Sequence, residues 1–77
     1  MPSPTYAALL RTVSEYVDGV KAKDVIDRQL TGGGANPDLF SNGDLQRLMI
    51  AVTTATKLYV SDKIRREEMV ARIRKMV

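Results

Sequence analysis

Basic side chains are concentrated at the end of this chain, and such groups bind phosphate or carboxylate. Residues 61–77 carry six cations against three anions, so they hold the whole net charge of +3, and residues 1–60 are neutral overall. This distribution is typical of a protein that meets an acidic partner. It is equally typical of a solvated helix face. The six cations are Lys63, Arg65, Arg66, Arg72, Arg74 and Lys75.

Several acids precede a base by four residues, the spacing of an ion pair on one helix face. These predicted pairs are Asp24–Arg28, Asp62–Arg66 and Glu68–Arg72. Arg65, Arg74 and Lys75 have no such partner, and Arg66 projects into the apolar arc of its helix although it has one. An electrostatic function is therefore sought at these four cations.

Catalysis has few candidate groups. The chain has neither His nor Cys, so the usual general base, the usual nucleophilic thiol and the commonest metal ligands are missing. The neighbouring acids, Asp24 with Asp27 and Glu67 with Glu68, lie beside bases and are explained by ion pairs. We expect a protein that is not an enzyme and holds no cofactor and no metal.

Two segments resemble half of a calcium loop, and one glycine run resembles a phosphate loop. With Asp62 as the sixth loop residue, Lys57 occupies the first ligand position, where a carboxylate is needed. With Gly43 as the sixth, Met49 occupies the twelfth, which also requires an acid. The glycines at 32–34 are not followed by the Lys-Ser or Lys-Thr of a phosphate loop. None of these segments predicts a binding site.

Nucleic-acid binding remains an alternative. Gly19 as the turn of a helix-turn-helix places Glu15 where a small residue is needed, and Asp24 and Asp27 would repel phosphates. No aromatic residue alternates with the cations of the basic segment, which argues against stacking on single strands. The remaining alternative is phosphate contact through the C-terminal helix, by Arg65, Arg72, Arg74 and Lys75.

The apolar pattern that positions these groups is helical. At 77 residues and 44% apolar composition, the chain is long enough for one domain with a small core. The prediction is an all-α fold of about four short helices: a helical pair at 3–31, a flexible Gly-rich loop at 32–38 and a second pair at 41–77. A domain this small without disulfides is expected to oligomerise or to join a complex.

The helix boundaries follow from capping patterns. Ser3 with Pro4 predicts the first start, and the apolar stripe continues to Val20, so a second helix is expected near Ala22. Ser41 and Asp44 form a capping box for the third helix. Asp62 is the candidate cap of the fourth, with Ile64 stapled onto Met69, although a continuous kinked last helix stays open.

The predicted core positions form one stripe on each helix. On the third helix they are Leu45, Leu48, Met49, Val52, Ala55, Thr56 and Tyr59. On the fourth they are Met69, Val70, Ile73, Met76 and Val77.

Two large apolar residues, Ile50 and Leu58, lie outside the stripe of the third helix and suggest a second contact surface. The favoured function is a small non-catalytic protein-protein interaction module, an adaptor or regulatory subunit. It would dock through Ile50 and Leu58, with Met69 and Met76, inside a rim formed by Arg65, Arg66, Arg74 and Lys75. No signal peptide or membrane-spanning run is recognised, so a cytoplasmic protein without membrane contact is expected.

Overall fold

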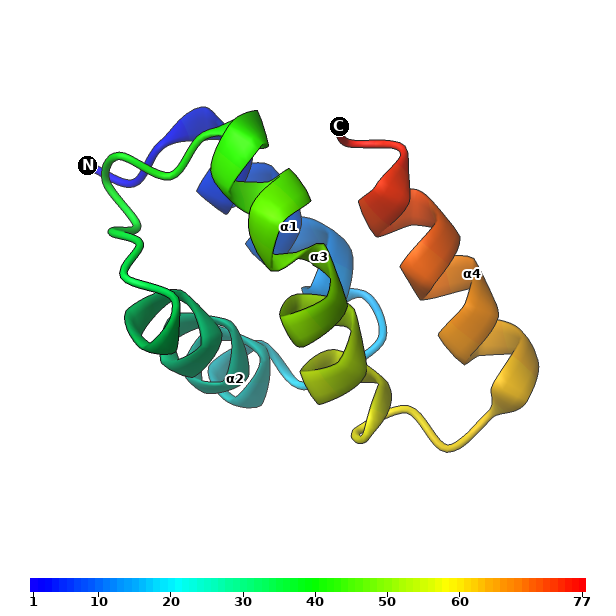
Figure 1. The fold of residues 1–77 in the computed structure, drawn as a ribbon. Helices are drawn as coiled ribbons and strands as arrows, with labels where there is room; N and C mark the ends of the chain where they lie inside the picture. The colour runs from blue at the N-terminus through cyan, green and yellow to red at the C-terminus, as the bar shows by residue number, and fades with distance from the viewer.

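A computed structural model describes all 77 residues, as four helices without a strand (Figure 1), which confirms the all-α prediction. The helices are α1 (Pro4–Ser14), α2 (Gly19–Gly32), α3 (Asn42–Lys57) and α4 (Lys63–Arg74). Residues 58–62 lie outside both α3 and α4, so the last two helices are separate.

Each helix begins at a side-chain oxygen that accepts from its first free N–H groups, as helix starts require. Ser3 accepts from the backbone of Tyr6, and Ser41 forms the predicted capping box with Asp44. Asp62 accepts from the first turn of α4, as predicted. Asp18 caps α2 in the same way.

The predicted boundary between the first two helices was wrong. α1 ends at Ser14, and α2 begins at Gly19 rather than near Ala22. The carboxylate of Asp18 accepts from the N–H groups of Val20 and Lys21, which fixes the new helix start. Val20 consequently leaves the predicted core stripe and is exposed.

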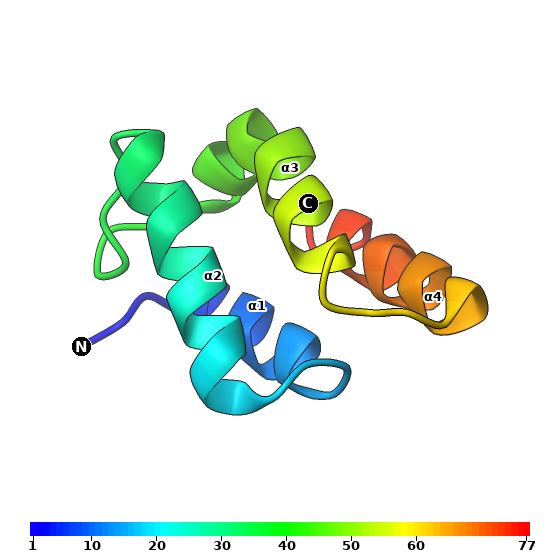
Figure 2. The same cartoon turned by 90° about the horizontal axis from the view of Figure 1, so that it is seen from below.

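One apolar core joins the four helices. α1 and α3 pack against each other and against both remaining helices, whereas α2 and α4 lie on opposite sides of this central pair (Figure 2). The N-terminal segment and the loop after α2 also meet, because the N–H of Ser3 donates to the carbonyl of Pro37 at 3.0 Å. The buried cluster comprises Tyr6, Leu9, Val13, Val17, Ala22, Ile26, Leu30, Phe40, Leu45, Leu48, Val52, Val60, Met69 and Ile73.

The predicted stripes of α3 and α4 need several corrections. Tyr59 lies beyond the end of α3 and is 47% exposed, and Val77 is also exposed. Ile64 is exposed as well, so its predicted staple onto Met69 does not form. On α4 only Met69 and Ile73 are fully buried. This helix therefore contributes little to the core.

Candidate binding surface

Residues of α4 make a polar contact with the end of α1. Arg72 places Nη2 2.6 Å from a carboxylate oxygen of Glu15, and its Nη1 donates to the Tyr16 hydroxyl at 3.2 Å. That hydroxyl in turn donates to Glu68 at 2.5 Å. Arg65 lies over the Tyr16 ring, 4.9 Å from its centroid, and donates to the carbonyl of Glu15 at 3.1 Å. Two of the basic cations are therefore used to hold α4 against α1.

This contact overturns one predicted ion pair and shifts two pKa values. Arg72 pairs with Glu15 instead of Glu68, whose carboxylate accepts from Tyr16. The hydrogen bond from Arg72 lowers the pKa of Glu15. The hydrogen bonds to Glu15 and Tyr16 raise the pKa of Arg72 further above its ordinary value.

The other two predicted pairs have different outcomes. Asp24 and Arg28 are paired at 3.3 Å, as predicted. Asp62 instead caps α4 with its carboxylate, so the predicted pair with Arg66 is wrong. Arg66 is half-buried and donates to the carbonyl of Val60 at 3.2 Å. Its side chain thus leaves the apolar arc along the loop before α4.

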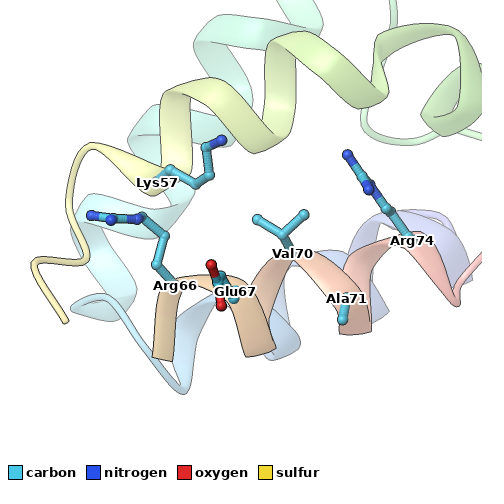
Figure 3. Close-up of a pocket in the computed structure, with 6 residues that line it drawn as sticks. All are labelled: Lys57, Arg66, Glu67, Val70, Ala71 and Arg74. Carbon is cyan, nitrogen blue, oxygen red and sulfur yellow. The ribbon is translucent and has the colours of Figure 1, made fainter. Parts of the chain in front are cut away.

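On its other flank, α4 is separated from α3 by an open groove of about 600 Å³ (Figure 3). Lys57, at the end of α3, lines the groove from the α3 side. Val70 points from α4 into the space towards α3, with Arg66 at one end of the groove and Arg74 at the other (Figure 3). The lining residues are Lys57, Arg66, Glu67, Val70, Ala71 and Arg74.

The cations of this groove have no acid partner. The five ion pairs of the structure, counted to 4.0 Å, include neither Lys57, Arg66 nor Arg74. Glu67, the one acid of the groove, is also unpaired within that distance. The groove therefore carries three cations against one acid, beside the apolar side chain of Val70, and this net positive charge suits an anion that also carries apolar surface.

The other residues predicted to bind a partner differ in exposure and in their position relative to this groove. Ile50 and Leu58 are each 80% exposed. Ile50 precedes Lys57 by seven residues, two helical turns, so it lies on the groove side of α3. Leu58 directly follows α3, and Lys75 follows α4. Met69 is buried in the core and cannot take part in docking.

Lys57 and Glu67 were not selected from the sequence as binding residues, and Val70 was assigned to the core. The position of Lys57 on the same helix side as Ile50 was a usable signal. The packing of α3 against α4 decides which side of α3 faces α4. A pattern within one helix does not predict that packing.

No cluster of three or more carboxylates is placed to hold a metal ion, and no helix is long and apolar enough to cross a membrane. No protein-family model, curated protein or solved structure matches the chain. The charged groove is therefore the main guide to function.

Proposed function

We propose that this chain is a small non-catalytic interaction module, an adaptor or regulatory subunit, that binds a protein partner along the groove between α3 and α4. The observation that carries the proposal is the set of three cations around Val70 without an acid partner. Like charges that share a groove repel one another, and carboxylates of a partner would relieve this repulsion. Ile50, exposed on the same side of α3, extends the surface with an apolar contact.

Nucleic-acid binding through the C-terminal helix has less support. Of its four predicted phosphate contacts, Arg65 and Arg72 already donate to Glu15 and Tyr16. Only Arg74 and Lys75 make no side-chain hydrogen bond or ion pair.

The proposal is tested by affinity capture with charge-reversed variants. In the groove variant, Lys57→Glu is combined with Arg74→Glu. In the matched control, Arg11→Glu is combined with Lys63→Glu, so the net charge changes equally at two exposed cations that lie outside the groove and are not predicted binding residues. Both variants are first shown to be folded by circular dichroism.

Proteins from a nuclease-treated lysate that bind the wild type and the control variant, but not the groove variant, support the proposal. Equal capture by all three forms contradicts it. Titration with duplex DNA tests the alternative, which expects a steep loss of affinity with salt, with a slope of about −0.9 per phosphate contacted.

A further inference from the structure

The groove residues of α4 have a regular spacing. Arg66, Val70 and Arg74 are four residues apart, so they follow one side of the helix. At 1.5 Å per residue, the two arginines are about 12 Å apart along the axis. Lys57 faces the Arg66 end from α3, and Val70 lies between the arginines (Figure 3). Glu67 lies beside Arg66 and Val70 (Figure 3), so two cations meet one acid at that end, and Arg74 is the cation at the other. The groove thus has net positive charge at both ends and an apolar side chain at its centre.

The carboxylates of this chain are already engaged, except Glu67 in the groove itself. Some cap helices, others form ion pairs, and Glu68 accepts from Tyr16. The engaged acids are Glu15, Asp18, Asp24, Asp27, Asp38, Asp44, Asp62 and Glu68. A second copy therefore has no free acidic cluster for this groove, and the net charge of +3 opposes self-association. The anion must come from another molecule.

The apolar centre limits the kind of anion. A phosphate backbone or a layer of lipid headgroups supplies charge but no apolar side chain opposite Val70. An amphipathic helix supplies both, because residues seven or eight apart lie two turns apart on one face, with a residue at i+4 between them. Such a helix matches the separation of about 12 Å between the arginines.

We infer that the groove binds an acidic amphipathic helix of another protein, with two carboxylates two turns apart and an apolar side chain between them. This inference rests on the proposed function and specifies the class of its partner. One carboxylate meets Arg66 and Lys57, and the other meets Arg74. The apolar side chain packs on Val70, as in other complexes in which a helix fills a groove.

The probe is a fluorescent synthetic helical peptide with two glutamates eight residues apart and a leucine midway. We expect saturable binding by anisotropy, and amide shifts in NMR spectra centred on Lys57, Val70 and Arg74. An exposed ion pair contributes up to about 1 kcal/mol, which is about fivefold in affinity. Reversing Lys57 and Arg74 together should therefore weaken binding by about tenfold or more. The control with Arg11 and Lys63 reversed should stay within about twofold.

The control peptides separate charge from apolar contact. Replacing both glutamates by glutamine, or the leucine by alanine, should each weaken binding. Binding of the glutamine peptide as tight as that of the parent overturns the inference, as does an equal loss in both protein variants. Tighter binding at the groove by a duplex oligonucleotide or a phosphatidylglycerol vesicle overturns it as well.

Failure here is distinguishable from failure of the proposed function. If the peptide does not bind while the groove variant still loses its captured proteins, the acidic helix is refuted and the interaction module stands. If the groove variant captures the same proteins as the wild type, the proposed function fails, and the inference fails with it.

Discussion

Arg72 of α4 and Glu15, which caps the end of α1, form an ion pair at 2.6 Å although 57 positions separate them in the sequence. Together with Tyr16, the pair holds α4 against α1. Such a contact is needed because α4 buries only Met69 and Ile73. Since the helix is held on its α1 side, its opposite side faces α3 across the open groove. The groove is thus a consequence of how α4 is attached.

Acid should weaken this attachment. The Arg72 hydrogen bond lowers the pKa of Glu15 from its ordinary value of 4.5. A carboxyl group with a lowered folded-state pKa stabilises the fold above its unfolded-state pKa, and that stability is lost as the pH falls through the folded-state pKa. Glu15→Gln should therefore be less stable than the wild type at pH 7, and the difference should vanish in acid. Urea unfolding between pH 7 and pH 3 measures this.

Arg72→Gln removes the other partner of the same pair and completes a double-mutant cycle. In the Arg72→Gln background, Glu15→Gln should cause little further loss of stability at pH 7, and the pH-dependent difference should disappear. If Glu15→Gln cost as much stability in that background as in the wild type, the Arg72–Glu15 pair would not be the origin of the effect.

The Tyr16 hydroxyl should contribute separately. It accepts from Arg72 and donates to Glu68, so Tyr16→Phe removes both hydrogen bonds but keeps the ring under Arg65. We expect the free energy of unfolding to fall by about 1 kcal/mol, with faster hydrogen exchange in α4 than in α2. Tyr59→Phe is the control, since that hydroxyl makes no hydrogen bond within the protein. An equal loss in both variants would refute a role for the hydroxyl network.

The parts of the fold that were predicted correctly depend on short-range patterns. Ser3, Ser41 and Asp62 were recognised as caps because a capping side chain and its N–H partners lie within three residues. Asp18 was missed because Val17 and Val20 both fit the periodicity of a longer first helix. In the structure α1 ends at Ser14, and the carboxylate of Asp18 starts a new helix at Gly19.

The groove was predictable only in part. Arg66 and Arg74 were selected, the first because of its position in an apolar arc and the second because it lacked an acid four residues away. Lys57 was missed, since its place in the groove depends on the packing of α3 against α4. The ion pair between Arg72 and Glu15 was also missed. The four-residue spacing of charges identifies partners on the same helix only, and Glu15 lies at the end of another helix.

The three consecutive glycines should respond differently to alanine. At Gly34 the backbone has φ of 73°, so alanine should destabilise the protein by about 1 kcal/mol. At Gly33 a Cβ would lie 2.5 Å from one methyl carbon of the buried Leu48, so a loss of about 1–3 kcal/mol is expected from overpacking. Gly32 is helical with open space around it, so Gly32→Ala should stabilise by about 0.4–1 kcal/mol.

Thermal unfolding of the three variants checks that order. Gly32→Ala should melt above the wild type and the other two below it. A lower melting temperature for Gly32→Ala would contradict the helical geometry at the end of α2.

Ile50 and Val52 give the sharpest test of how α3 is oriented. They are two residues apart, roughly 200° around the helix, and Ile50 is 80% exposed whereas Val52 is fully buried. Ile50→Asp should change the free energy of unfolding by less than about 0.5 kcal/mol. Val52→Asp buries an unpaired carboxylate and should abolish folding, since such a charge costs about 3–5 kcal/mol, as much as a core of this size supplies. Circular dichroism and urea unfolding measure both.

Unfolding of the Ile50 variant would mean that α3 turns a different side to α4, and Lys57 would then not line the groove. A folded Ile50 variant allows any loss of peptide affinity to be assigned to the surface itself.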